Sequence, residues 1–298
     1  MYKRQLQGFS GPNGDTLAVG TLTASNGAVA NNGNGTFSEI AQLAGVARTD
    51  WSWAPLLADL DNDGWKDLMV TNGFKHDIRN NDYQQQVYQK LKTGEEFYKT
   101  LDLVPSSRLR NYLFRNNGAD ETGRARLTFA DSSQAWGFTE PVNSNGAAYA
   151  DLDNDGDLDV FIMRGAWLDE HGQHPNSLLR NDGNLKFTDV TFDSGLGEFS
   201  FPIKSSGWAD FDNDGDLDRY LANETKNVIA PCQLFRNEGN GKFVEVAKQA
   251  GVADEHFSMG AVWGDYNADR FPDLYLSIRG DNKLYRNNRD GTFTDVAK

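Results

Sequence analysis

The chain has 298 residues, of which 38% are hydrophobic, and its formal net charge is −14. This length fits one large all-β domain or two domains of average size. The acidic charge, without a basic patch, argues against a nucleic-acid partner, because nothing would neutralise the phosphates. No apolar run approaches the roughly 18 residues of a membrane span. Cys232 stands alone, so no disulfide framework is expected.

The N-terminal part predicts short strands and tight turns, followed by an acidic loop. Residues 17–22 (LAVGTL) predict a strand, and residues 30–37 (ANNGNGTF) predict a hairpin turn, because Asn and Gly tolerate positive φ. The acidic loop lies at residues 59–67 (DLDNDGWKD). Oxygen ligands at alternating positions, with Gly at the sixth for a sharp turn, are what calcium requires. We therefore expect a calcium loop between two strands.

Residues 74–108 interrupt this pattern and predict a helical insertion. Asp82 is a candidate N-cap for a helix with an apolar face that ends at Gly94. A second short helix is expected over residues 95–101. The insertion either packs on a face of the fold or acts as a lid or partner-docking element, since loops on a rigid scaffold commonly carry function.

The rest of the chain repeats the acidic loop and the Asn-Gly turn. The loop recurs at residues 151–159 (DLDNDGDLD) and 210–218 (DFDNDGDLD), and in degenerate form at 265–273 (DYNADRFPD). Seventeen of the 43 acidic residues lie in these four loops, whose first aspartates are 92, 59 and 55 residues apart. Carboxylates this dense repel one another unless a cation neutralises them. The turn recurs at residues 115–129, 180–187, 236–243 and 286–293.

This repeat predicts an all-β fold, a β-propeller. Each period holds two strands around the acidic loop and two around the Asn-Gly turn, and four antiparallel strands repeated radially make a propeller blade. A β-helix would repeat roughly every 20–30 residues. An EF-hand would need helices on both sides and Glu in place of Ile162. We expect about five blades or partial blades over residues 1–298, with the helical insertion at 74–108.

The two ends of the sequence bear on whether the propeller forms a closed ring. The last turn, at residues 283–296, is expected to lack its inner strands, and residues 17–22 look like a strand whose acidic loop is missing. Either the two ends pair in one blade of a small closed ring, or both are cut edges of a larger propeller. Cut edges would leave backbone groups unpaired. We favour the fragment, truncated at both ends.

The acidic loops and the Arg-Asn-x-Gly turns together resemble the FG-GAP/VCBS repeat family over nearly the whole chain. That family includes integrin-α-like propellers. The chain looks most similar to bacterial, cartilage-acidic-protein-like surface proteins that carry these repeats ahead of a C-terminal ASPIC/UnbV domain, and we expect such a domain to be missing here. The resemblance implies calcium ligation by side chains at the first, third, fifth and ninth positions of each loop, and by the carbonyl at the seventh.

The metal ligands implied by the resemblance are Asp59, Asp61, Asp63, Trp65 and Asp67; Asp151, Asp153, Asp155, Asp157 and Asp159; Asp210, Asp212, Asp214, Asp216 and Asp218; and Asp265, Asn267, Asp269, Phe271 and Asp273. We expect about four calcium ions. The fourth should bind weakest, because Asn267 removes a negative charge and Arg270 stands where the turn favours Gly.

Features that suggest an enzyme are few. His171 and His174, beside Asp169 and Glu170, would make an incomplete transition-metal site and are better explained as a solvated loop. The sequence contains no G-x-S-x-G elbow, no phosphate-binding G-K-[S/T] loop and no H-E-x-x-H helix. We predict no catalytic residue and no organic cofactor.

The sequence thus predicts a non-enzymatic, calcium-stabilised binding or adhesion scaffold for a glycan or protein ligand. A periplasmic, cell-surface or secreted location is expected, because cytosolic calcium is too scarce to fill weak sites. The alternative is a carbohydrate-active enzyme, a polysaccharide lyase or hydrolase on the same fold, using insertion residues such as His76, Asp77, Arg79 and Tyr83.

Overall fold

The computed structural model describes residues 7–10, 16–20, 27–73, 80–92, 103–105, 108–165, 175–184, 186–198, 200–225 and 229–297. Contacts group the chain into two compact units, which we describe separately. The first holds Met1–Pro55, Leu68–Gln134 and Phe138–Ser144, and the second holds Leu56–Asp67, Ala135–Gly137 and Asn145–Lys298.

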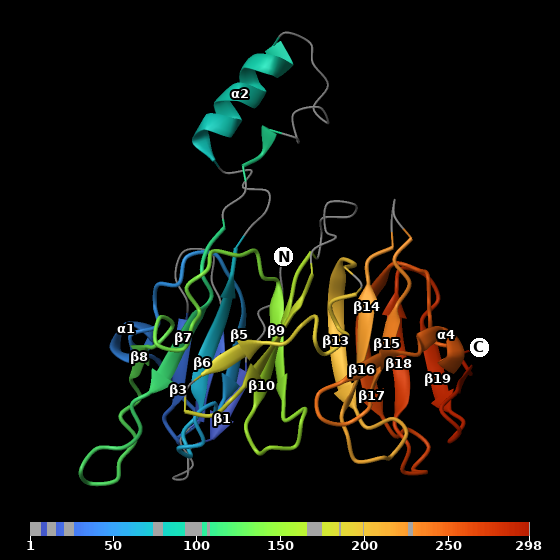
Figure 1. Ribbon diagram of the computed structural model, residues 1–298. Coiled ribbons are helices and arrows are strands. Elements are labelled where there is room, and N and C mark those ends of the chain that lie inside the picture. Colours follow the sequence, from blue (N-terminus) through green and yellow to red (C-terminus); the bar gives the residue numbers. More distant parts are fainter. Residues whose placement is uncertain are drawn as a thin grey trace. The chain divides into compact units, whose positions relative to one another are not determined.

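The described strands form five antiparallel sheets, each a meander of four strands in chain order (Figure 1). Two sheets come from the first half of the chain: β1 (Gln7–Ser10), β2 (Thr16–Gly20), β3 (Gly27–Asn31) and β4 (Phe37–Glu39); then β5 (Ser52–Ala58), β6 (Asp67–Asn72), β7 (Tyr112–Asn116) and β8 (Phe129–Asp131). The predicted fold class, an all-β propeller of four-stranded blades with a short helical insertion, is confirmed.

Three further sheets belong to the second unit. Their strands are β9 (Gly146–Ala150), β10 (Asp159–Met163), β11 (Ser177–Asn181) and β12 (Phe187–Asp189); β13 (Ile203–Ala209), β14 (Asp218–Asn223), β15 (Gln233–Asn237) and β16 (Phe243–Glu245); β17 (Ser258–Gly264), β18 (Asp273–Ile278), β19 (Lys283–Asn287) and β20 (Phe293–Asp295). In each, the acidic loop joins the first two strands and the Asn-Gly turn joins the last two. The predicted content of one repeat, two strands around the loop and two around the turn, is confirmed.

The hydrophobic core of the second unit lies between successive sheets. Phe161 of β10 meets Trp208 of β13 edge-on, with ring centroids 6.5 Å apart. One sheet later, Tyr220 of β14 meets Trp263 of β17 in the same way at 6.2 Å. Aromatic pairs of this geometry contribute about 0.5–1.5 kcal/mol beyond their buried area. The repeat seen in the sequence is therefore also a repeat of sheet-to-sheet contacts.

The expectation that the two ends hold incomplete blades is wrong. Strands β19 and β20 complete a sheet with β17 and β18. At the other end, residues 17–20 lie in β2, which pairs with a preceding strand, β1. No described residue of 17–20 pairs with residues 283–296. The repeat unit begins one strand before each acidic loop, so the last Asn-Gly turn closes a sheet.

The helices are short apart from α2 (Asn81–Lys92), which confirms the predicted helix of the insertion. Its N-cap is Asn80, whose side-chain oxygen accepts a hydrogen bond from the Tyr83 backbone N–H at 3.1 Å. Asp82, the predicted cap, lies in the first turn, where a negative charge favours the helix dipole. The second predicted helix, over residues 95–101, lies outside the described residues. Among the described helices, none is long and apolar enough to cross a membrane.

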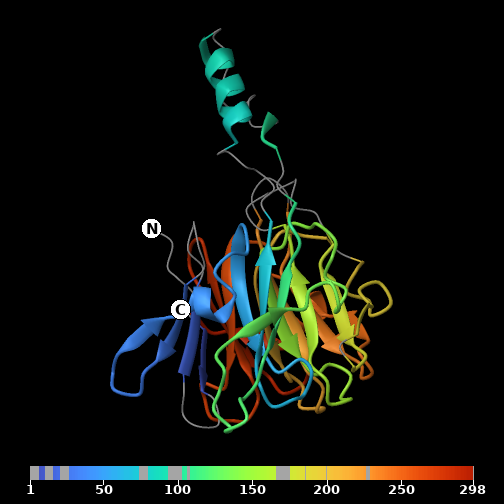
Figure 2. The ribbon, with the colours of Figure 1, turned by 90° about the vertical axis from the view of Figure 1, so that its left-hand side faces the viewer.

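Two one-turn helices follow the fourth strand of their sheets. They are α1 (Ala41–Ala44), which lies beside β3 (Figure 2), and α4 (Ala247–Ala250). Each ends at a glycine with positive φ, 79° at Gly45 and 80° at Gly251. Glycine adopts this conformation without the Cβ clash that other residues suffer.

Candidate metal centres

Each acidic loop is a tight turn closed by its first aspartate. In the first loop, the backbone N–H groups of Asp63 and Gly64 donate to the two carboxylate oxygens of Asp59, at 3.1 and 3.0 Å. The third loop repeats both bonds at 3.1 Å. The turn requires positive φ at its fourth and sixth positions, 55° at Asn62 and 88° at Gly64. Asn and Gly are the residues that adopt such angles most readily.

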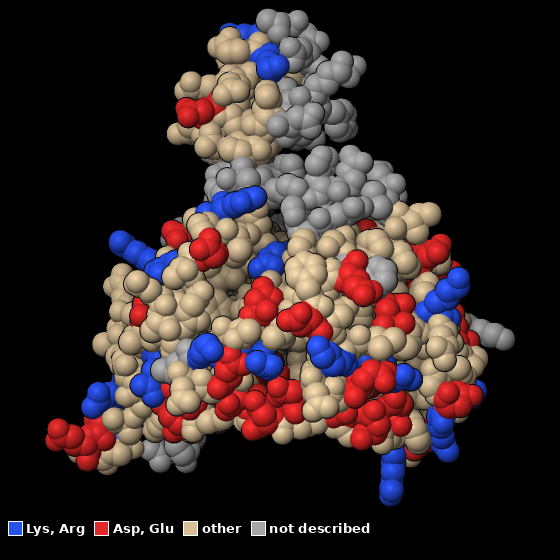
Figure 3. All heavy atoms as spheres, viewed as in Figure 1, with Lys and Arg blue, Asp and Glu red and all other residues tan. Residues whose placement is uncertain are grey.

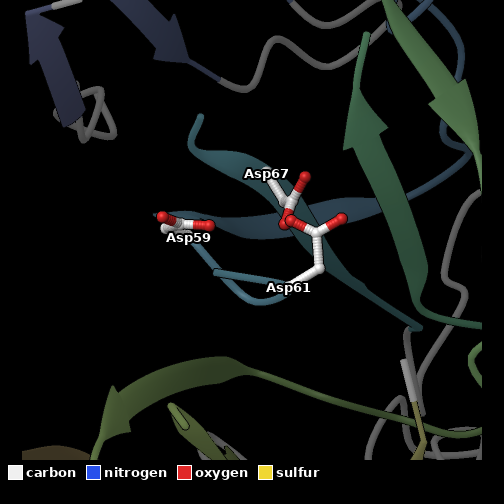
Figure 4. Close-up of side chains that lie close together, drawn as sticks. All are labelled: Asp59, Asp61 and Asp67. Atoms are coloured by element: carbon white, nitrogen blue, oxygen red, sulfur yellow. The ribbon is translucent and has the colours of Figure 1, made fainter. Parts of the chain in front are cut away.

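This turn brings carboxylates together. Asp59, Asp61 and Asp67 face one another in the first loop (Figure 4), and one oxygen of each lies within 4.8 Å of the others. Equivalent groups in the second and third loops are Asp151, Asp153 and Asp155, and Asp210, Asp212 and Asp218. The structure thus gathers three of the predicted side-chain ligands in each of three loops.

Several of these carboxylate oxygens are buried without a hydrogen-bond donor among the described residues. They are Oδ1 of Asp151, Oδ1 of Asp153 and Oδ1 of Asp212. Burial, together with repulsion from neighbouring aspartates, raises the pKa of Asp153 and of Asp212. A buried, uncompensated anion costs several kcal/mol, and a hard cation that prefers oxygen would remove that cost. These donor sets therefore fit calcium.

The ninth position of each loop holds a buried aspartate, which in the second, third and fourth loops joins the loop to the Asn-Gly turn of its own sheet. Asp159 accepts hydrogen bonds from the backbone N–H groups of Leu152, at 3.0 Å, and Asn181, at 2.9 Å. Asp218 makes the same two bonds at 2.9 and 2.8 Å. Burial outweighs these bonds and raises the pKa of Asp159 and of Asp218 to about 7.

The first Asn of the turn also donates a hydrogen bond to the preceding acidic loop of the second unit. The Asn181 side-chain amide donates to the Leu60 carbonyl of the first loop at 2.8 Å. Asn237 and Asn287 donate in the same way to the second and third loops, at 3.0 and 2.8 Å. Sequence reasoning treated these residues only as turn formers. The Arg-Asn pair before each turn, repeated in phase with the loops, was the signal that would have identified them.

A second set of hydrogen bonds connects the acidic loops directly. The Asn62 side chain donates to Oδ1 of Asp157 in the next loop at 2.6 Å, and Asn154 donates to Oδ1 of Asp216 at 2.6 Å. The side chains of these two seventh-position aspartates thus bind a neighbouring loop, and a ligand role for their carbonyls stays a prediction. Acidic side chains gather along the lower edge of the face in Figure 3.

The fourth loop differs. All of its residues are described, and no group of three carboxylates forms there. Asp265 accepts backbone N–H groups as its equivalents do, at 2.9 and 2.7 Å. Asp269 instead forms an ion pair with Arg289, at 2.9 Å. The predicted ligands Asn267, Phe271 and Asp273 are in the loop but do not join such a group.

The remaining candidate residues from the sequence are the histidine loop, the insertion residues of the enzymatic alternative, and Cys232. The predicted loop with His171 and His174 lies outside the described residues, as do His76, Asp77 and Arg79 of the enzymatic alternative. Tyr83 is buried. Cys232 is buried with its Sγ 3.1 Å from the Ser258 hydroxyl, and burial raises the pKa of its thiol. Its chemistry is that of an unreactive internal thiol.

Five described four-stranded sheets, four of them with an acidic loop between their first two strands, define a repeat protein of the β-propeller class. The FG-GAP-like repeat model matches residues 14–70, 99–162 and 210–276, well over half of the sequence, and the chain belongs to this family.

Two curated relatives are cartilage acidic protein 1 of Homo sapiens, 28% identical over 172 residues, and of Xenopus tropicalis, 31% identical over 176 residues. Each alignment covers 56% of this chain, but only 24% and 25% of the relative. The chain therefore spans about a quarter of the length of these relatives. Among solved structures, it is similar to an Agrocybe aegerita lectin described for specific recognition of non-reducing terminal N-acetylglucosamine, with a TM-score of 0.49 and 16% identity, covering 98% of this chain and 64% of that one.

Proposed function

We propose that this chain is a calcium-stabilised β-propeller that serves outside the cytosol as a binding or adhesion scaffold. The observation that carries the calcium assignment is the group of converging carboxylates in each of three loops, with buried oxygens of Asp151, Asp153 and Asp212 that no described donor reaches. A cation at each group would neutralise charge that burial penalises. The ion would have a structural role and perform no chemistry.

The ligand residues proposed from this geometry are Asp59, Asp61 and Asp67; Asp151, Asp153 and Asp155; and Asp210, Asp212 and Asp218. The remaining side chains at the fifth and ninth positions would complete each set. Because the loops of successive sheets are joined by Asn62 and Asn154, an ion in one loop would also hold the loop beside it.

A location with abundant calcium suits such sites. With a Kd of about 10 μM and about 1 mM calcium, each site contributes about 2.7 kcal/mol by mass action. Three sites together would contribute as much as the whole net stability of many domains, roughly 5–15 kcal/mol. We therefore propose that the protein is secreted or exposed at the cell surface.

Thermal unfolding tests the structural role of calcium. We expect Tm to fall by at least about 10 °C when EDTA replaces calcium, since 1 kcal/mol shifts Tm by about 2–4 °C in a protein of this size class. Magnesium serves as the control, because it demands stricter octahedral geometry and keeps its waters. Equal midpoints in calcium and EDTA would contradict the proposal.

The ligand class is tested by glycan and protein arrays probed in calcium and in EDTA. In calcium, the protein should bind specific glycans or proteins on the array, and this binding should disappear in EDTA. A parallel screen for turnover of acidic polysaccharides separates a scaffold from a carbohydrate-active enzyme. Product formation that depends on the protein would contradict the scaffold proposal and support the carbohydrate-active enzyme instead.

A further inference from the structure

The fourth loop keeps the backbone conformation of the other acidic loops, although its sequence differs from theirs. Ala268 has a φ of 59°, the same as Asn154 in the second loop, and Arg270 has a φ of 73° where Gly156 has 92°. A residue with a Cβ pays roughly 1–2 kcal/mol for this conformation. Something therefore holds the loop in a shape that its own residues disfavour.

The turn that faces this loop carries an arginine where the others carry glycine. Arg289 occupies the place of Gly183 and Gly239 in the two preceding sheets. A Cβ at those glycines would lie 3.1 Å from Oδ2 of Asp157 and 3.3 Å from Oδ2 of Asp216. The seventh-position aspartate thus crowds the space beside each of these glycines.

In the last sheet Phe271 replaces that aspartate, and the arginine side chain reaches into the loop. Nη2 of Arg289 donates to Oδ2 of Asp269 at 2.9 Å, and Nε donates to the same oxygen at 3.2 Å. The guanidinium carbon also lies 5.8 Å from the centre of the Phe271 ring. The Asp269 side chain is only 13% exposed in this arrangement. The two sequence changes, at residues 271 and 289, are thus complementary.

We propose that the Arg289 guanidinium takes the place of a metal ion in the fourth loop. The loop contains three carboxylates, against four in the first loop and five in each of the second and third. It forms no group of three converging carboxylates, and its Asp269 already pairs with a cation from within the chain. The protein then binds three calcium ions, and its C-terminal sheet keeps its loop ordered without calcium. The ion count rests on the proposed calcium binding of the other loops; the role of Arg289 does not.

Hydrogen exchange in EDTA tests the role of Arg289 without any metal. Arg289→Gly, which suits the left-handed φ of 65° at this position, should make amides of residues 265–273 exchange about two- to fivefold faster, the range expected for an exposed ion pair. Arg289→Lys should keep most of the protection, because it keeps the positive charge. Arg286→Ala, an exposed arginine of the same turn, is the control. Unchanged exchange in Arg289→Gly would overturn the inference.

Calcium titration by calorimetry tests the ion count. Wild type should bind three ions, and calcium should slow exchange at residues 59–67, 151–159 and 210–218 but not at 265–273. The triple variant Asn267→Asp, Arg270→Gly, Arg289→Gly should bind four. Four ions in the wild type would overturn the inference and leave the proposed function standing. No binding at any loop would overturn the proposed function, while the exchange experiment would still decide the role of Arg289.

Discussion

At the scale of single residues, two buried charged side chains, those of Asp218 and Arg219, have pKa values that burial shifts. Asp218 is fully buried, accepts two backbone N–H groups, and has a pKa raised to about 7 by burial. Its ionised form is costly unless a cation compensates for it. The residue is thus poorly suited to a metal-free loop and well suited to an occupied one.

The variant Asp218→Asn should separate these two states. In EDTA it removes a disfavoured charge at the cost of one hydrogen bond, so the free energy of unfolding should change by about 1 kcal/mol or less. In saturating calcium the loss should be larger by about 2.7 kcal/mol, the contribution of one site at a hundred times Kd. Urea unfolding in both conditions measures the difference. Asp193→Asn, on the exposed surface, is the control, and equal losses in both conditions would contradict the assignment.

Arg219 is a buried cation whose guanidinium packs against two aromatic rings. Its guanidinium carbon lies 3.3 Å from the centre of the Phe161 ring and 4.1 Å from that of Trp208, and Nη2 donates to the Ser206 hydroxyl at 2.8 Å. Burial lowers its pKa well below the usual value. Its Nε and Nη1 have no hydrogen-bond partner among the described residues. The cost of removing this cation from water is thus set against its contacts with two aromatic rings and one hydrogen bond.

We therefore expect Arg219→Met to be neutral or stabilising by about 1 kcal/mol, because buried ionic groups often cost more than apolar replacements of similar volume. Arg219→Lys should destabilise by about 2 kcal/mol, since a compact ammonium lacks the planar face that stacks on both rings. Urea denaturation of the two variants measures both effects. A loss above about 2 kcal/mol in Arg219→Met would show that the stacking outweighs the desolvation.

At the scale of a sheet, the Asn-Gly turn does more than reverse the chain. Asn237 is fully buried, and its side-chain amide donates to the Leu152 carbonyl of the preceding loop at 3.0 Å. Asn237→Ala should leave that carbonyl without this donor and cost about 1–3 kcal/mol. Asn184→Gly is the matched control, because Asn184 is an exposed turn residue with a φ of 51° that Gly adopts freely. Equal stability of the two variants in chemical denaturation would refute the linking role.

The sequence allowed the elements to be predicted better than the contacts between them. The in-phase acidic loops and turns identified the four-stranded sheets. The helix cap is Asn80, only two residues before the predicted cap, Asp82. The phase of the repeat was missed, because a turn signal does not say whether it opens or closes a sheet. Asn181 was read as a turn residue because its local propensity explains it fully. Burial of Arg219 was not foreseeable, since a charged residue in a strand usually faces water.

At the scale of the whole molecule, the acidic loops of the second unit form a connected row. Asn154 links the second loop to Asp216 of the third at 2.6 Å. Asn154→Gly suits the φ of 59° and removes this link. We expect calcium affinity at the third loop to fall about two- to fivefold, equivalent to about 0.5–1 kcal/mol, with the first loop unchanged. Calorimetric titration measures this, with Asn240→Gly as control; unchanged affinity would mean that the loops act independently.

The direction of these hydrogen bonds bears on how the protein is made. Asn181 and Asn237, late in their sheets, donate back to the acidic loop of the preceding sheet. A ribosome delivers the acceptor first and the donor only when the third strand of the next sheet has emerged. Each of these turns can therefore bond to the preceding acidic loop as soon as its own third strand is complete, without waiting for the remainder of the chain. The order of acceptor and donor along the chain therefore permits the second unit to assemble from its N-terminal side, one sheet at a time.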